Sequence, residues 1–285
     1  MKLQIKLLLL TLLFPIAAMA QIVVSNDSAA TFDADSIRRH YSNDLGPRFG
    51  AYKDNYFVFG TAIGSRPTKT NTNVKFQISI QQRLTNTTLP FGAYLYLFYT
   101  QKVFWNVLEN SLPMTDLNFN PGIGVAKPFF SRSDGRYLGK LMVQIEHESN
   151  GKDSIWSRSW NRITFGASVY LDRNIMVYGK VWIPIIDGQH NRDILKYCGI
   201  FQSGMQIMSN NRRFGVAINL TKRQSWNPFN YNSQIDVKYC LGKHSNQYIY
   251  LQYYNGYGEG LLDYKQHHST LRIGICLSPF FFSDY

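Results

Sequence analysis

Three features are scarce or missing in this sequence, and each absence excludes a class of protein. Only three cysteines occur among 285 residues, widely spaced at Cys198, Cys240 and Cys276. They predict neither a disulfide framework nor a metal cluster, and one bridge is the most they permit. No apolar run of about eighteen residues follows residue 20, so a helical span is not expected there. No dense run of lysine or arginine is present either, which argues against a nucleic-acid partner despite the basic charge.

The first twenty residues have the composition of a secretory signal peptide. Lys2 and Lys6 precede an apolar stretch that ends in the small-x-small pattern Ala18-Met19-Ala20. We expect residues 1–20 to be removed. Because they contain two lysines and no acid, their removal lowers the formal charge from +12 to +10. Export leaves two classes open, a soluble exported protein and an outer-membrane barrel.

The dominant periodicity of the chain is two residues, which predicts β-strands. Apolar side chains fall on one parity in VKFQISIQ (74–81), GAYLYLFYTQKVFW (92–105) and LRIGICL (271–277). Similar segments recur to the end of the chain between turns rich in Asn, Gly, Asp and Pro, and no stretch has a convincing helical period. The pattern predicts about twelve strands of about ten residues, the length that a tilted membrane strand requires.

Aromatic and charged residues favour a membrane barrel over a soluble periplasmic β-sandwich, the alternative fold. Aromatic side chains make up 15% of the chain, and several stand near predicted strand ends, where a barrel has its aromatic girdles: Trp105, Trp156, Trp160, Tyr170, Trp182, Tyr253, Tyr254 and Tyr257. Charges that suit a polar lumen occupy the opposite parity: Lys75, Lys102, Glu146, Arg162 and Arg272. We therefore predict an all-β fold, an antiparallel transmembrane β-barrel of about twelve strands over residues 51–285. A non-barrel segment, residues 21–50, would precede it.

Three polar residues interrupt the apolar parity at the ends of two predicted strands. In LMVQIEHESN (141–150) that parity continues into His147 and Ser149, and Asn161 leads the same parity of the next strand. The three would stand on the outer, lipid-facing surface, where polar groups indicate function. An imidazole can take the proton of a serine hydroxyl, and an amide oxygen can orient the ring, so a Ser-His-Asn triad is possible. The other reading is polar residues at the membrane interface; the usual G-x-S-x-G serine motif is absent from the sequence.

Two motifs around this group resemble the signature of the outer-membrane phospholipase A family. They are His147-Glu148-Ser149-Asn150-Gly151 and Ser157-Arg158-Ser159-Trp160-Asn161-Arg162. Four further segments resemble the same family: KDNY (53–56), VKFQIS (74–79), YTQK (99–102) and YNGYGEGLLDY (254–264). The resemblance therefore covers most of the chain after about residue 50, and the motifs are highly specific in combination.

The resemblance implies a calcium-dependent hydrolase of the Gram-negative outer membrane. Its substrates would be the acyl esters of phospholipids and lysophospholipids, and its active form would be a homodimer. Ser149 would be the nucleophile, His147 the general base and then acid, and Asn161 the residue that orients the histidine. The main-chain N–H of Gly151 would help to stabilise the oxyanion.

The resemblance also implies a Ca²⁺ site at the dimer interface. The Ser157 hydroxyl and the Lys152 carbonyl match two ligand positions, and a carbonyl near Ser111 would come from the partner chain. Calcium accepts such oxygen ligands together with waters. Two departures from the family pattern concern this site, namely residues 153–155 (Asp-Ser-Ile) and a shorter loop around Ser111.

Gln101 lies on the lipid-facing parity between Tyr99 and Val103. An unpaired amide facing lipid is costly, so we expect Gln101 at a dimer interface, the other reading being a glutamine solvated near the membrane surface. The alternative function for the whole chain is a non-catalytic outer-membrane barrel, either a channel or a structural or adhesive protein. Periodicity alone does not separate a plugged lumen from an open one.

Overall fold

The structure, a computed structural model, describes residues 49–85, 88–131, 137–185, 190–242 and 245–279. The elements are β1 (Phe49–Ala51), β2 (Asn55–Ala62), β3 (Thr72–Arg83), η1 (Pro90–Gly92), β4 (Tyr94–Trp105), β5 (Met114–Phe130), β6 (Tyr137–Ser149), η2 (Ser154–Trp156), β7 (Ser159–Tyr170), β8 (Ile175–Ile185), α3 (Leu195–Cys198), β9 (Phe201–Met208), β10 (Phe214–Lys222), β11 (Tyr231–Cys240), β12 (Gln247–Gly256) and β13 (His268–Leu277). The predicted signal peptide and residues 21–48 lie outside the described ranges. None of the helices within these ranges is long and apolar enough to cross a membrane.

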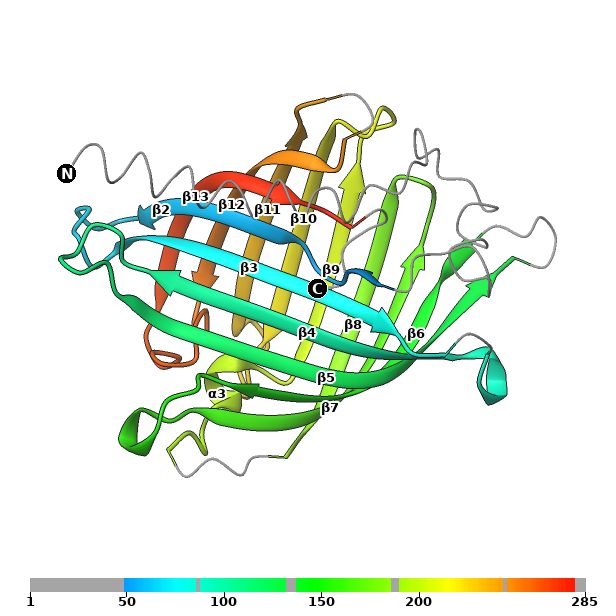
Figure 1. Cartoon of the computed structure of the whole chain (residues 1–285), viewed down its shortest axis with the longest axis horizontal. Coiled ribbons are helices and arrows are strands. Elements are labelled where there is room, and N and C mark those ends of the chain that lie inside the picture. The colour runs from blue at the N-terminus through cyan, green and yellow to red at the C-terminus, as the bar shows by residue number, and fades with distance from the viewer. Residues whose placement is uncertain (1–48, 86–87, 132–136, 186–189, 243–244, 280–285) are drawn as a thin grey trace.

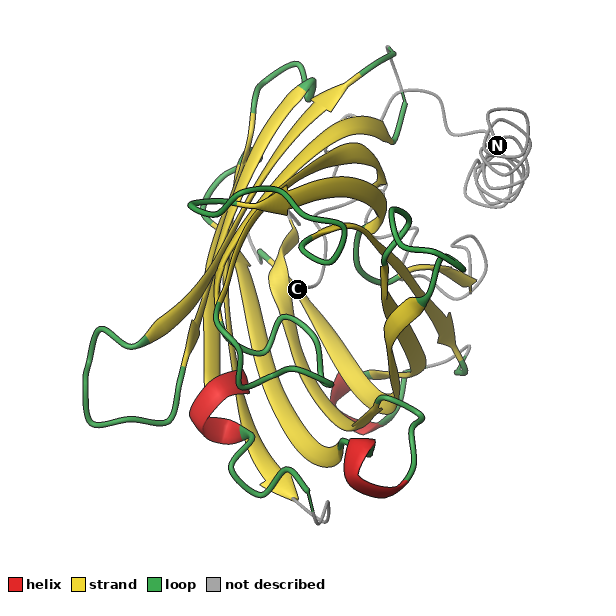
Figure 2. Cartoon of the chain, turned by 90° about the vertical axis from the view of Figure 1, so that its left-hand side faces the viewer, coloured by secondary structure: helices red, strands yellow, loops and turns green. Residues whose placement is uncertain are grey.

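Strands β2 to β13 form a closed antiparallel barrel of twelve strands, which confirms the predicted fold class. Each strand pairs with its neighbours in the sequence, and β2 closes the ring by pairing with β13 as well as with β3 (Figure 1). Seen from one end, the strands curve round into a continuous wall (Figure 2). The short β1 pairs with β3 at Ile80 to Gln82, beyond the pairing of β2. β1 and β2 therefore act as one interrupted strand, and the predicted barrel start at residue 51 falls at the end of β1.

The two parities of the strands separate as the sequence predicts. Large apolar side chains are exposed on the outer face of the barrel, among them Phe59, Leu97, Ile123, Leu141, Val143, Ile145, Phe165, Val181, Ile183, Ile218, Ile235, Ile249, Leu271 and Ile273. Polar and charged side chains are buried inside, among them Lys75, Gln144, Glu146, Thr164, Lys180, Asn219, Asp236, Lys238, Gln252 and Arg272. An apolar exterior around a polar interior is the arrangement that lipid requires of a barrel.

The connections at the two ends of the barrel differ in length. At the end that we name the loop end, the strands are joined by residues 63–71, 106–113, 150–158, 186–200, 223–230 and 257–267. At the opposite turn end, they are joined by residues 84–93, 131–136, 171–174, 209–213 and 241–246. Ser149 is the last residue of β6, so the predicted triad lies at the loop end.

Two connections of the loop end pack into the lumen and occupy it. Ile194 from the β8–β9 connection and Leu261 and Tyr264 from the β12–β13 connection form a buried cluster with Trp160. Two backbone N–H groups of the second connection donate to side chains of β5: Leu261 to Asn118 Oδ1 (3.1 Å) and Leu262 to Asp116 Oδ2 (3.0 Å). Its Glu259 binds Lys75 Nζ at 3.0 Å and Arg272 at 2.6 Å, and all three side chains are buried. We name residues 257–267 the plug loop.

The positions of some aromatic residues correct the prediction of girdles. Trp160 is 2% exposed and Tyr254 8%, because both stand on the lumen parity and pack against the loops inside the barrel. Trp182 packs against the same interior cluster. Nearness to a strand end correctly predicted how far along the barrel axis these residues lie. It did not determine whether their side chains face the lumen or the lipid. The three cysteines are all free thiols, so the one bridge that their number permits is not formed.

Candidate active site

The predicted triad residues come together on the outer face of β6 and β7. The antiparallel register places His147 opposite Asn161 and Ser149 opposite Ser159. His147 Nδ1 lies 2.8 Å from Asn161 Oδ1, a hydrogen bond in which the ring nitrogen donates to the amide oxygen. Ser149 is two residues beyond His147 on the same face, so the alternating parity of one strand presents the base and the hydroxyl side by side. The three side chains are all half-buried rather than fully exposed.

One row of outward-facing residues crosses the barrel wall at the level of Ser149. In this row Gln101 of β4 stands opposite Phe119 of β5, and Phe119 stands opposite Ser149. Gln101 therefore lies two strands from the predicted nucleophile. Its Oε1 accepts a hydrogen bond from the Tyr99 hydroxyl at 3.2 Å, so the amide oxygen has a partner within the chain.

Asn150 organises the connection between the two site strands. Its side chain is 2% exposed and spans the base of residues 150–158. Nδ2 donates to the Trp156 carbonyl at 2.9 Å, and Oδ1 accepts from the N–H groups of Lys152 (3.3 Å) and Arg158 (3.0 Å). The backbones of Asn150 and Arg158 are also hydrogen-bonded to each other, at 3.0 Å. The loop that follows Ser149 is therefore held from within by the residue next to the predicted nucleophile.

Gly151 is a glycine that this turn requires. Its φ of +64° is in the left-handed region, and an added Cβ would lie 2.9 Å from the Phe119 ring. The close approach of Phe119 and the backbone of Gly151 covers one side of the turn after Ser149. A larger residue at position 151 would displace either the ring or the turn, so the sequence motif has a direct steric reason here.

The lumen face of the same strands carries a buried ion-pair group. Arg162 donates to Glu148 Oε2 at 2.7 Å and to Glu146 Oε2 at 2.9 Å, and the Thr164 hydroxyl donates to Glu146 Oε1. The Arg162 guanidinium also lies 4.5 Å from the centre of the Trp160 ring. Glu146 and Arg162 thus face the lumen, as their parity predicts, and Glu148 shares the same arginine.

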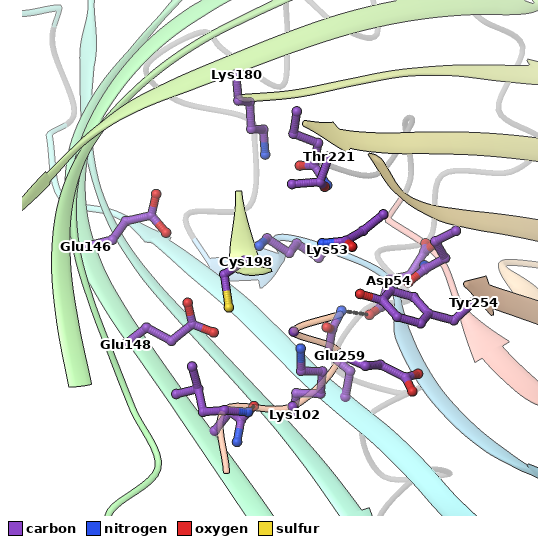
Figure 3. A pocket seen from close by; sticks show the side chains of 18 of the residues that line it. Lys53, Asp54, Lys102, Glu146, Glu148, Lys180, Cys198, Thr221, Tyr254 and Glu259 are labelled. Carbon is purple, nitrogen blue, oxygen red and sulfur yellow. Dashed lines mark hydrogen bonds between the residues drawn. The ribbon is translucent and has the colours of Figure 1, made fainter. Parts of the chain in front are cut away.

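A polar cavity of about 240 Å³ remains inside the barrel behind the site strands. Figure 3 shows Glu146 and Glu148 extending into it from the same strand, with Lys53, Lys102 and Cys198 also at its border. Burial raises the pKa of the Cys198 thiol to about 12, so this group stays protonated at neutral pH and is a poor nucleophile. The triad residues on the outer face are therefore better candidates for catalysis than the Cys198 thiol.

The remaining predicted site residues lie around residues 150–158 and in the next connection. Lys152 is exposed and Ser157 half-buried, on the two sides of the loop that Asn150 ties together. Ser111 is exposed in the β4–β5 connection with a φ of +67°. Among the described residues, no three His, Cys, Asp or Glu side chains gather as a metal-binding group. A cation near this loop would take most of its ligands from hydroxyl and carbonyl oxygens, because Asp153 is the one carboxylate among residues 150–158.

Sequence reasoning missed two supporting asparagines. Asn120 Nδ2 donates to the His147 carbonyl at 2.8 Å, and the fully buried Asn191 donates to the Ser159 carbonyl at 2.9 Å. The β7–β8 pairing ends at Asn161, so the Asn191 side chain supplies the donor to the Ser159 carbonyl in place of a β8 backbone group. Pro121, which lacks an N–H, was the available signal that β5 needs a side-chain donor beside His147. Nothing local in the sequence indicated Asn191.

Comparison with known proteins is consistent over most of the chain. The family model described as Phospholipase A1 matches residues 21–277. Phospholipase A1 of Escherichia coli K12 is 30% identical over 211 residues, which cover 73% of this chain and 70% of that protein. Phospholipase A1 of Proteus vulgaris is 31% identical over 248 residues, 81% of each chain.

Solved structures share the fold. The outer membrane phospholipase A from Escherichia coli matches with a TM-score of 0.70 and 26% identity, over 82% of this chain and 99% of that one. A Salmonella typhi outer membrane phospholipase, crystallised as a dimer with bound calcium, matches with a TM-score of 0.73 and 24% identity, over 88% of this chain and all of that one. The chain is thus similar to these proteins in both sequence and barrel.

Proposed function

The chain belongs to the phospholipase A1 family and is an outer-membrane ester hydrolase, and from this premise we propose that Ser149, His147 and Asn161 hydrolyse the acyl esters of phospholipids and lysophospholipids. The observation that carries the proposal is the 2.8 Å contact between His147 Nδ1 and Asn161 Oδ1 on the lipid-facing surface, next to an outward-facing serine. An imidazole oriented in this way has its second ring nitrogen available to accept the serine proton.

Acylation would use each of these residues in turn. The Ser149 hydroxyl attacks the ester carbonyl while His147 takes its proton, and Asn161 holds the ring and its tautomer. The backbone N–H of Gly151 stabilises the negative oxygen of the tetrahedral intermediate. His147 then returns the proton to the leaving alkoxide, and the alcohol product, a lysophospholipid when the substrate is a phospholipid, departs.

Deacylation would repeat these steps with water. His147 takes a proton from a water molecule, whose oxygen attacks the acyl-enzyme carbonyl, and Ser149 leaves with that proton as the fatty acid forms. Because the site is on the outer wall of the barrel, an acyl chain can reach it without leaving the bilayer. The longer connections at the loop end indicate that the site faces the cell exterior.

Ca²⁺ fits the oxygen donors available around residues 150–158. Asn150 ties the backbone at Lys152 and Arg158 together, which places the Lys152 carbonyl and the Ser157 hydroxyl on the two sides of one small loop. Calcium accepts carbonyl and hydroxyl oxygens together with waters, and its charge would favour a developing oxyanion. The solved Salmonella typhi relative is a dimer with bound calcium. A carbonyl near Ser111 of a second copy would complete the same ligand set here.

A homodimer would use the wall that contains Gln101. The amide oxygen of Gln101 is engaged by Tyr99 within the chain, which leaves its NH₂ group to donate across a two-fold interface. Gln101, Phe119 and Ser149 occupy one row of the wall. A second barrel packed on β4 would therefore border the catalytic group and enclose part of a substrate cleft. Dimerisation would then control activity.

Fatty-acid release from phospholipid tests the proposal. Refolded protein is assayed with calcium or with a chelator and is compared with Ser149→Ala and with Ser233→Ala, a matched variant of an outer-wall serine on β11. We expect calcium-dependent release from the native chain and from Ser233→Ala, and none from Ser149→Ala. Release that survives in Ser149→Ala would refute the assignment of the nucleophile.

A further inference from the structure

Two large apolar side chains stand exposed in the loop that follows the predicted nucleophile. Ile155 is 64% exposed and Trp156 58%, both in η2 of the loop that follows Ser149. Asn150 donates to the Trp156 carbonyl at 2.9 Å, so this pair, the 155–156 tip, is tied to the residue adjoining Ser149. We propose that the 155–156 tip binds the headgroup–acyl boundary of a membrane phospholipid and makes the enzyme selective for lipid in a bilayer over dispersed esters. The inference rests on the proposed function.

Hydrogen bonds within the loop hold its backbone and leave these apolar groups outside. Asn150 bonds three backbone groups of residues 150–158, and Arg158 donates to the carbonyls of Ile155 and Ser157, each at 2.8 Å. None of the three hydrophobic clusters in the described part of the chain includes Ile155 or Trp156. A fixed loop that presents two apolar side chains loses little further entropy when a ligand covers them.

A second apolar surface lies on the other side of the catalytic group. Below Ser149 on the barrel wall, Ile145 is 57% exposed, and Ile183 and Ile185 of β8 are 56% and 51% exposed. The polar triad thus lies between two apolar surfaces. The barrel wall faces the acyl chains, and the 155–156 tip lies toward the headgroups. A phospholipid whose ester carbonyl reaches Ser149 would contact both, and tryptophan favours this interfacial depth.

Sheet order favours lipid over a second copy of the chain as the occupant. Gln101, the predicted dimer contact, is on β4, whereas the tip joins β6 to β7 and the isoleucines of the wall continue to β8. A partner packed on β4 would reach the proposed calcium ligands Lys152 and Ser157 from the β4 side, and the β8 isoleucines beyond the tip would stay open to lipid. Apolar surface that continues from the wall into the tip fits one extended lipid molecule.

The test compares two substrates and three variants in protein reconstituted with calcium. The substrates are a long-chain phosphatidylcholine in vesicles and a soluble short-chain nitrophenyl ester. Trp156→Ser and Ile155→Ser remove the two apolar contacts. Trp226→Ser is the matched control, because Trp226 is fully exposed in the loop between β10 and β11, well away from Ser149 around the barrel.

We expect the apparent KM for vesicle lipid to rise about tenfold in Trp156→Ser and severalfold in Ile155→Ser, as loss of a buried apolar contact predicts. Turnover of the soluble ester should stay within about twofold of the native value, and Trp226→Ser should match the native protein on both substrates. Equal losses on both substrates, equal losses in Trp226→Ser, or unchanged KM for vesicle lipid would each overturn the inference.

Two further measurements distinguish a lipid contact at the tip from a contact between copies and from a chain that is not a lipase. If Trp156→Ser lowers the dimer yield in chemical crosslinking, the tip is a contact between copies and the lipid assignment is wrong. If the native protein hydrolyses neither substrate, the proposed function itself fails. Quenching of tryptophan fluorescence by brominated phosphatidylcholine, compared between native protein and Trp156→Phe, then still tests the lipid contact. A lack of difference would exclude it.

Discussion

The third member of the proposed triad is an amide, which has a physical consequence at the scale of single residues. Asn161 accepts a hydrogen bond from His147 at 2.8 Å and so orients the ring, but it carries no charge to stabilise the imidazolium. We therefore expect Asn161→Ala to lower kcat less than His147→Ala, by about tenfold to a hundredfold against about a hundredfold to ten-thousandfold. Steady-state kinetics on phospholipid would check the order, and a larger loss in Asn161→Ala would contradict these roles.

The Ser157 hydroxyl supplies the other prediction at this scale. As a proposed calcium ligand it should affect calcium affinity before it affects chemistry. Ser157→Ala should raise the calcium concentration for half-maximal activity about tenfold, while the rate at saturating calcium changes less. Ser159→Ala, two residues further on and paired with Ser149 across the strands, is the comparison for general disturbance of the loop. Unchanged calcium dependence in Ser157→Ala would remove it from the ligand set.

At the scale of elements, the plug loop depends on one buried carboxylate. Burial opposes the ionisation of Glu259, but Arg272 and Lys75 outweigh it and hold the pKa of this carboxyl well below its usual range. A lowered folded-state pKa stabilises the structure above the ordinary carboxyl pKa, and this contribution is lost as the pH falls below about 4 toward the folded value. The protection of residues 257–267 against hydrogen exchange, measured relative to the intrinsic rate at each pH, should therefore fall at acid pH.

Glu259→Gln provides the control for that prediction. The variant leaves Arg272 without its carboxylate partner, although Lys75 Nζ keeps its 2.7 Å contact with Gln252. Loss of one partner of a buried ion pair costs about 3 kcal/mol, so the protection of the plug loop should already be lower at neutral pH and should fall little further in acid. Protection of the plug loop in the native protein that does not change with pH would contradict the role of Glu259.

The elements also show what the sequence could and could not predict. Alternation between two environments determines the strands and their inward and outward faces, which is why Lys75, Glu146 and Arg162 were assigned to the lumen correctly. The same rule placed His147, Ser149 and Asn161 on one outer surface. The contacts of Asn191 and of the plug loop join segments far apart in the chain, and no periodicity records them. Trp160 was misplaced because strand-end position, rather than parity, guided its assignment.

At the scale of the whole molecule, the filling of the lumen distinguishes an enzyme with a filled barrel from a channel. A lumen lined with charged residues is compatible with either, but here the β8–β9 connection and the plug loop pack together across the interior. The space left is a cavity of about 240 Å³ behind the site strands and one of about 550 Å³ at the loop end, and the plug loop lines both. Hydrogen bonds from the plug loop to Asp116 and Asn118 fix it to the opposite wall. The barrel should therefore not conduct ions in the manner of a porin.

Planar-bilayer recordings of the native protein, and of a variant in which residues 259–264 are replaced by glycine and serine, would test this prediction. Removal of Glu259, Leu261 and Tyr264 eliminates the ion pair and the apolar contacts that hold the plug loop. We expect the native barrel to remain closed and the variant to open in discrete steps, because a polar lumen without its filling admits water. Large steps in the native protein, equal in Ser149→Ala, would show that the barrel conducts independently of its hydrolytic site.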